Sequence, residues 1–251
     1  MILAIANQKG GVGKTTTAIN LGAGLGALER RVLLVDCDPQ ANATRGLGAR
    51  TTAAPNLYHV LTGEVALEEA ILTSGFPNLD LVPSQRDLVG VEVEFVGEAG
   101  WEKKLKRILA EVAGRYDTIL LDCPPSLGHL TVAALTAADG VLVPLQCEYF
   151  ALEGISELLA TVKRIQASLN PRLAIAGILL TMYDDRTNLS KDVAEEIRSH
   201  FAEKVYDTVV PRNVRLAEAP SHGLPIFQYD IKSRGAEAYL ALAREFLRRA
   251  A

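Results

Sequence analysis

The sequence contains few cysteines and no disulfide-like cysteine pattern. Cys37, Cys123 and Cys147 are the three cysteines among 251 residues, their number is odd, and no C-x-x-C spacing occurs. This pattern does not indicate a disulfide framework, and each thiol lies in or beside an apolar run, where free cysteine acts as a small hydrophobe. We therefore expect a protein of the reducing cytoplasm.

Long hydrophobic runs and an excess of positive charge are also missing. The apolar start, residues 1–6, is too short for a signal peptide, and the longest later run, residues 173–182, is shorter than a membrane span. A net charge of −4 and a pI of about 5.7 exclude a uniformly basic nucleic-acid binder. Contact with DNA or a membrane must therefore use a local patch.

Short apolar runs alternate with longer helical patterns along the chain. Strands buried on both faces of a parallel sheet have such nearly continuous apolar sequences, and the alternation predicts an α/β fold with a doubly wound, mostly parallel sheet and helices on both faces. We expect one domain over residues 1–251, with residues 40–78 as its least regular part. The predicted strands are 2–6, 31–35, 79–82, 118–121, 140–145, 175–181 and 205–210, and the predicted helices are 14–28, 101–114, 127–138, 152–168, 188–201 and 234–249.

A glycine-rich segment follows the first predicted strand and opens the first predicted helix. Its sequence is Gln8-Lys9-Gly10-Gly11-Val12-Gly13-Lys14-Thr15-Thr16-Thr17. The glycines allow successive backbone N–H groups to form an anion cradle, to which the helix N-terminus adds partial positive charge. Lys14 supplies a full charge to the outer phosphates, and the Thr15 hydroxyl can ligate Mg²⁺. The segment predicts a triphosphate site.

This segment resembles the deviant Walker A motif of the ParA/MinD superfamily. The strict phosphate-loop pattern has glycine where this chain has Gln8, and a second lysine, Lys9, follows. The superfamily includes partitioning ATPases, the cell-division-site ATPase MinD and the nitrogenase iron protein. The resemblance implies the P-loop NTPase fold, ATP and Mg²⁺ as cofactors, and an ATP-bound homodimer in which Lys9 reaches the partner's nucleotide.

Two further strands end in carboxylates. Asp36 and Asp38 follow one apolar strand, and Asp122 ends another, before Pro124-Pro125. Ligands of doubly wound folds lie at the carboxyl ends of strands, so these groups point toward the phosphate loop. A rigid strand that delivers an acid toward Mg²⁺ is the Walker B arrangement, and we assign that role to Asp122. Asp36 could contact Mg²⁺ through water. The resemblance to the superfamily's switch I segment implies that Asp38 acts on the attacking water.

The C-terminal third contains a sharply turned polar segment, residues 211–223. It resembles the partition family's base-holding segment, so Pro211 and Asn213 are the candidates for contact with adenine. The expected ATP contacts are thus Lys9, Gly10, Gly11, Val12, Gly13, Lys14, Thr15, Thr16, Pro211 and Asn213. The expected catalytic residues are Lys9, Lys14 and Asp38, and the expected metal ligands are Thr15, Asp36 and Asp122.

Basic residues gather in the same third, with seven Lys/Arg against four Asp/Glu between residues 212 and 249. The partition family binds DNA without sequence preference through surface basic residues, which implies phosphate contacts here. Only seven residues precede Gln8, so we expect no operator-binding region before the phosphate loop. We favour Arg186 and Arg215 as DNA contacts, with Arg212 and Lys232 next.

The resemblance is strongest to the short ParA (Soj) type, also in residues 146–154, 186–189 and 233–237. It implies a nucleoid-associated partitioning ATPase whose ATP dimer binds double-stranded DNA and whose slow hydrolysis is stimulated by a ParB-type partner. Three alternatives stay open. They are a MinD-like membrane regulator, an iron-protein-like reductase, and a binding switch with negligible turnover. The alanine-rich C-terminal helix does not indicate the membrane contact that the first of these needs.

Overall fold

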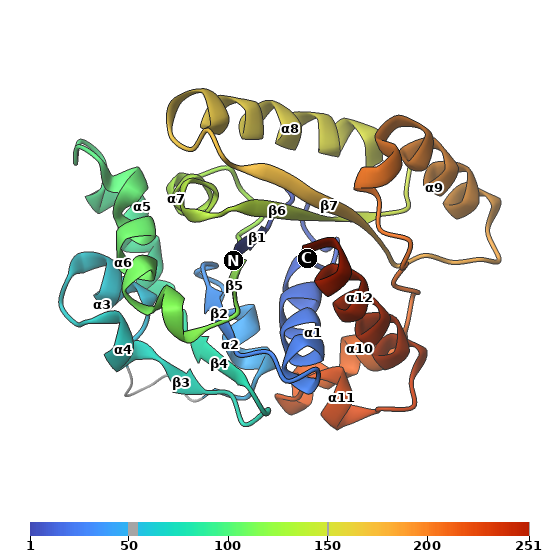
Figure 1. The fold of residues 1–251 in the computed structure, drawn as a ribbon, viewed down its shortest axis with the longest axis horizontal. Helices are drawn as coiled ribbons and strands as arrows, with labels where there is room; N and C mark the ends of the chain where they lie inside the picture. Colours follow the sequence, from blue (N-terminus) through green and yellow to red (C-terminus); the bar gives the residue numbers. More distant parts are fainter. Residues whose placement is uncertain (50–54, 150, 251) are drawn as a thin grey trace.

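The computed structural model describes residues 1–49, 55–149 and 151–250, which form a seven-stranded sheet flanked by helices (Figure 1). The order across the sheet is β3-β4-β2-β5-β1-β6-β7, and β3 alone of these strands runs antiparallel to its neighbour. The predicted doubly wound, mostly parallel sheet is confirmed. The strands are β1 (Ile2–Ile5), β2 (Val32–Asp36), β3 (Leu72–Thr73), β4 (Leu79–Val82), β5 (Thr118–Asp122), β6 (Gly140–Gln146) and β7 (Ala174–Thr181).

The helices cover both faces of the sheet. The longer ones are α1 (Lys14–Ala27), α6 (Lys104–Val112), α7 (His129–Ala137), α8 (Ala151–Ser168), α9 (Asn188–Phe201) and α12 (Arg234–Ala250). The shorter ones are α2 (Asn42–Gly46), α3 (Leu57–Thr62), α4 (Leu67–Ala70), α5 (Val91–Glu94), α10 (Val214–Glu218) and α11 (Ile226–Tyr229). The predicted irregular segment 40–78 thus contains α2, α3, α4 and β3.

Successive strand residues point to opposite faces of the sheet and belong to two hydrophobic clusters, one on each face. Ala4, Leu33 and Val35 pack with α3 to α9, whereas Leu3 and Ile5 pack with α1 and α12. Figure 1 shows α1 beside α12 on one side of the sheet and α8 on the other. The central strands β2 and β5 are buried along their whole length, which agrees with their apolar sequences.

The predicted strand at residues 205–210 is wrong. The segment forms an isolated bridge to β7, between Ile178 and Val205, and two of its N–H groups, those of Tyr206 and Val210, donate to β7 carbonyls, but it forms no continuous ladder. The backbone N–H groups of Asp207 and Thr208 donate instead to the Glu245 carboxylate on α12, at 2.8 and 2.9 Å. Because a side chain satisfies these donors, the segment does not extend the sheet.

The strand register brings the candidate site together. Asp36 at the end of β2 pairs with Asp122 at the end of β5, and Asp122 pairs with Ile5 at the end of β1. The chain leaves β1 into the phosphate loop, so two acidic strand ends and the loop lie at one edge of the sheet. The predicted convergence of these elements is observed.

Candidate nucleotide site

The phosphate loop has the backbone that its glycines predict. Gly11 and Gly13 lie at φ of 75° and 90°, in the left-handed region that disfavours other residues. Gly13 is also the N-cap of α1 and offers no side chain to the first N–H groups of the helix. These donors are therefore left for an anion, as a phosphate-binding helix N-terminus requires.

Neighbouring elements hold this loop from two sides. The Asn7 side-chain amide donates to the Pro144 carbonyl on β6 at 2.8 Å, and its oxygen accepts the Lys9 N–H at 3.0 Å. The Thr181 hydroxyl at the end of β7 donates to the Val12 carbonyl at 2.8 Å. The cradle is thereby pre-organised without a nucleotide.

Lys14 is buried inside the loop that it serves. Its ammonium donates to the Lys9 carbonyl at 3.0 Å, and only 7% of the residue is exposed. Burial lowers the pKa of Lys14, whereas the charge of Asp122 raises it. A triphosphate would supply the negative charge that this buried ammonium lacks.

Asp122 is the polar group with the least satisfied environment. Both of its carboxylate oxygens are buried and have no hydrogen-bond partner among the described residues. Burial raises the pKa of Asp122 well above its ordinary value. The nearby Thr15 hydroxyl opposes this rise, although the hydroxyl does not form a hydrogen bond of good geometry with the carboxylate. Oxygen ligands of this kind suit Mg²⁺, and a cation beside Thr15 would relieve the buried charge. The residues present therefore fit the metal.

Asp36 and Asp38 differ although they are two residues apart. Asp36 is fully buried and accepts the Thr44 N–H and hydroxyl at 2.8 and 2.7 Å; burial, opposed by these bonds, raises its pKa to about 6. Asp38 accepts the Gln40 N–H at 2.8 Å and lines the phosphate cavity. Asp38 thus faces the cavity, whereas Asp36 anchors the segment to α2, so any metal contact of Asp36 has to compete with Thr44.

Replacing Asp122 by asparagine should stabilise the nucleotide-free protein at pH 8, by about 1–3 kcal/mol, because the amide does not place a charge in the core. The carboxyl group is most compatible with the fold when protonated, and this advantage is lost as pH rises through its raised pKa. The gain should therefore be smaller at pH 5. Urea unfolding of variant and wild type at both pH values measures this gain, with the exposed Asp192→Asn as control. A gain in the free energy of unfolding that is equal at pH 5 and pH 8 would contradict the prediction.

Two adjoining cavities extend from the loop. The first, about 480 Å³, is lined by loop residues, by Asp38 and by Pro125, which lies in the turn after β5. The second, about 320 Å³, is mostly apolar and is lined by Pro211, Asn213 and Tyr239 among others. Gly13, Thr16 and Met182 line both. Phosphates and a base can thus occupy one continuous site.

Asn213, the predicted base contact, also caps a helix. Its side-chain oxygen accepts the Arg215 N–H at 2.8 Å and caps α10, while its amide N–H₂ group stays available for a base edge. Pro211 forms a bridge to Tyr183 beyond the end of β7. These contacts fix the wall of the base cavity on both sides of Arg212.

Lys9 is engaged within its own chain. Its ammonium lies 2.9 Å from the Glu148 carboxylate, and the two side chains are 42% and 44% exposed. Glu148 also accepts a short hydrogen bond from Gln146. A half-exposed pair of this kind contributes little stability, so Lys9 can exchange it for another anion at small cost. The segment around this pair includes Phe150, which lies outside the described residues.

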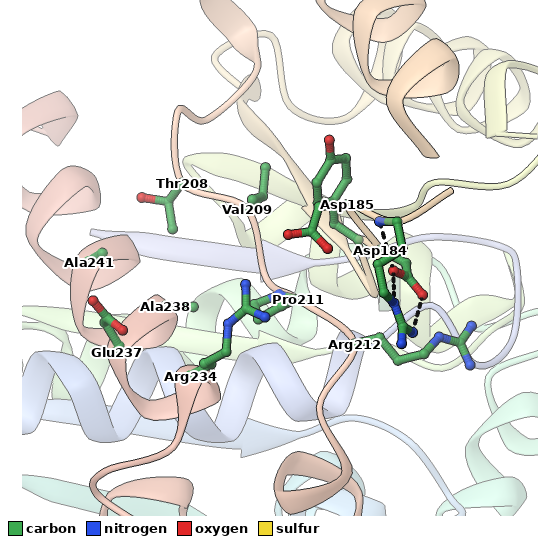
Figure 2. A pocket seen from close by; sticks show the side chains of 12 residues that line it. Asp184, Asp185, Thr208, Val209, Pro211, Arg212, Arg234, Glu237, Ala238 and Ala241 are labelled. Carbon is green, nitrogen blue, oxygen red and sulfur yellow. Dashed lines mark hydrogen bonds and ion pairs between the residues drawn. The ribbon is translucent and has the colours of Figure 1, made fainter. Parts of the chain in front are cut away.

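The candidate DNA contacts differ in their surroundings. Arg186 makes a bidentate pair with Asp184, at 2.8 and 2.7 Å, yet its side chain is 81% exposed. Arg215 pairs with Glu218 and Asp230, at 2.9 and 3.4 Å. Arg212 and Lys232 make no side-chain ion pair within the described ranges. Arg212, Arg234 and Asp184 line a cavity of about 560 Å³. Figure 2 shows the side chains of these three residues at this cavity.

Sequence reasoning missed several residues of the nucleotide site. Thr181 ends a predicted strand and Met182 follows it, and Asn42 and Arg45 lie in the segment expected to be irregular. The position of Thr181 at a strand end on the loop side was a usable signal. Tyr239, from α12, offered none, because its contact with Thr17 at 3.1 Å joins residues 222 positions apart.

Comparison with known proteins identifies the family of this chain. A family model described as an AAA domain matches residues 1–175. The chromosome partitioning protein ParA of Caulobacter vibrioides is 55% identical over 251 residues, covering 99% of this chain and 94% of that protein. The chain belongs to the ParA/Soj family of chromosome-partitioning ATPases. The predicted family is thereby confirmed.

Other ParA/Soj relatives and fold neighbours extend over the same length. The sporulation initiation inhibitor protein Soj of Bacillus subtilis is 55% identical and covers 97% of each chain. A crystal structure of cobyrinic acid a,c-diamide synthase from Mycobacterium smegmatis, with bound ATP analog and magnesium, is 40% identical with a TM-score of 0.87, covering 99% of this chain and 95% of that one. No helix in the described ranges has the length and apolar character needed to span a bilayer.

Proposed function

We propose that this ParA/Soj-family chain is a single-domain, cytoplasmic and nucleoid-associated partitioning ATPase that binds ATP with Mg²⁺. Its ATP-bound homodimer binds double-stranded DNA without sequence preference, and slow hydrolysis, accelerated by a ParB-type partner, releases it. The observation that supports this best is the unpartnered Asp122 carboxylate beside the buried Lys14 and the open phosphate cradle. The solved relative with an ATP analog and magnesium has a similar fold.

The chemistry divides among groups that the fold already positions. The loop N–H groups and Lys14 bind the phosphates and stabilise the charge that develops during phosphoryl transfer. Mg²⁺, held by Thr15 and Asp122 with Asp36 behind them, would neutralise phosphate charge when bound. Asp38, at the cavity wall, orients the attacking water. Pro211 and Asn213 hold the base.

Lys9 serves the dimer in this proposal. Lys9→Ala should still take up ATP as a monomer, because the cradle and Lys14 remain, but it should not form the ATP-dependent dimer. Size-exclusion chromatography with light scattering measures this. Glu148→Ala is the matched control, since it frees Lys9 from its pair without removing the ammonium. An ATP dimer of Lys9→Ala with wild-type stability would contradict the role of Lys9.

DNA binding should depend on Arg186, Arg212, Arg215 and Lys232. The Asp184 pair fixes the direction of the Arg186 guanidinium without hiding it, so N–H groups stay open to a phosphate. Arg186→Ala should weaken binding to any duplex alike and reduce the slope of log affinity against log salt by about 1. Fluorescence anisotropy with random-sequence duplexes tests this, with the exposed Arg164→Ala as control. An unchanged salt slope would remove Arg186 from the interface.

The MinD-like alternative makes a different prediction for the same protein. Of the large residues on α12, Leu242 and Phe246 are buried in the core rather than presented to a membrane. Co-sedimentation with anionic vesicles in ATP distinguishes the two functions. Recovery in the vesicle pellet would favour the membrane regulator over the DNA-binding ATPase.

A further inference from the structure

An exposed apolar face lies on residues 86–96, which comprise a 3-10 turn (Arg86–Gly90), α5 (Val91–Glu94) and the turn that follows it. Val89, Val93 and Val96 are 51%, 73% and 69% exposed, and their spacing of four and three residues places them on one side of this segment. The opposite side, with Leu88, Val91 and Phe95, packs into the core. A helix that is apolar on both sides is typical of a buried one. We call Val89, Val93 and Val96 the valine face.

This grouping is unusual for the molecule. The large hydrophobic side chains with high exposure among the described residues are Met1, Val89, Val93, Val96, Tyr149, Leu189, Val214 and Ile231. Three of these eight fall within one segment of eight residues, whereas the others are spread along the chain. Scattered exposed apolar residues need no explanation, but a contiguous group indicates an interaction site.

The same segment contacts the start of α7. Glu92 accepts the His129 N–H at 3.1 Å and the Leu130 N–H at 3.4 Å, and it lies 2.7 Å from the His129 ring nitrogen Nδ1. These residues begin α7, directly after the segment whose Pro125 lines the phosphate cavity. The Trp101 ring packs edge-on against His129 at 4.5 Å between centroids. A protein seated on the valine face would therefore touch a helix that holds the start of α7.

The charge around the valine face selects among possible occupants. Residues 85–98 contain Asp87, Glu92, Glu94 and Glu98 against one base, Arg86. Within the described ranges only Glu98 pairs with a lysine or arginine, Lys104 at 3.4 Å. A second copy docked symmetrically would place this acidic surface against itself, and anionic lipid would also be repelled. A basic segment with apolar anchors complements it.

We propose that the valine face is the docking surface for a basic, amphipathic segment of the protein that stimulates ATP hydrolysis. This rests on the partner-stimulated ATPase cycle proposed above. The partner buries the three valines and places its Lys or Arg side chains near Asp87 and Glu94. The partner makes contact beside Glu92, which bonds to the start of α7. A displacement of this segment by the partner therefore reaches α7 and the nucleotide cavity over a short distance. The small apolar area suits a transient contact rather than a permanent complex.

The test uses Val93→Asp in the full chain, with ATP and the purified full-length ParB-type protein of the same organism as the probe. We expect basal phosphate release and melting temperature to match wild type, since Val93 is 73% exposed. Half-maximal stimulation should need at least about tenfold more partner, because a carboxylate would be buried against an apolar anchor. Val93→Ile should behave as wild type.

Ile231→Asp is the matched control. Ile231 is 70% exposed and lines a cavity with Phe227, which packs in the cluster on the other face of the sheet. Full stimulation of Val93→Asp at the wild-type partner concentration would overturn the docking surface while leaving the proposed ATPase intact. Failure of the partner to stimulate even wild type, with ATP still hydrolysed, would instead overturn the partner step and the docking surface together.

Discussion

Replacing Lys14 by alanine is expected to weaken ATP binding by about 100-fold or more. Lys14 is 7% exposed, and its ammonium is held by the loop that would surround the phosphates. Removing one partner of a buried charge pair typically costs about 2–5 kcal/mol, and each 1.4 kcal/mol is about a tenfold change in affinity. Isothermal titration calorimetry with Mg-ATP measures the difference.

Lys163→Ala supplies the control for this experiment, because Lys163 is exposed on α8, away from the described nucleotide cavities. A melting curve for each variant separates lost binding from lost folding. ATP uptake by a folded Lys14→Ala with wild-type affinity would contradict the phosphate site, and with it the ATPase proposal.

Replacing Asp38 by alanine should reduce ATP hydrolysis by about 10²- to 10³-fold while ATP binding is retained. A positioned side chain that orients or activates a nucleophile typically contributes about this much. Asp38 lines the phosphate cavity, and its side chain does not anchor the chain to α2 as that of Asp36 does through Thr44. Phosphate release and calorimetry report the two effects separately.

The same variant tests the dimer cycle. If hydrolysis returns the dimer to monomers, Asp38→Ala with ATP should accumulate as a dimer that persists through size-exclusion chromatography. The control variant Asp192→Ala, at an exposed position, should return from dimer to monomer as wild type does. A monomer under every nucleotide condition, in both variant and wild type, would remove the ATP dimer from the proposed cycle.

Much of the fold could be predicted from local pattern alone. The sequence predicts the strands β1, β2, β4, β5, β6 and β7 and the six longer helices, because each strand is an apolar run and each helix a longer pattern that alternates with these runs. β3 was missed because two residues show no period. Residues 205–210 have the apolar sequence of a strand, but Glu245, on a distant helix, takes its donors.

The sequence predicts which residues belong to the candidate site, but not which hydrogen-bond or ion-pair partners these residues have. Three aspartates at strand ends are visible in the sequence, yet only the structure shows Thr44 bonded to Asp36 and both oxygens of Asp122 without a partner. Lys9 and Glu148 are 139 residues apart, so no spacing rule could have paired them. Likewise, Arg186 and Arg215 look alike as exposed bases until their carboxylate partners are seen.

The sequence by itself determined the cradle and the sheet type. A loop with glycines at positive φ between an apolar strand and a helix depends on a few consecutive residues, and so does the burial that makes parallel strands apolar. Tertiary structure alone decided which charges are satisfied, which are left for a ligand, and which apolar face stays open. Those outcomes depend on groups brought together from distant parts of the chain, such as Glu92 and His129, whose contact exists only once the helices have packed.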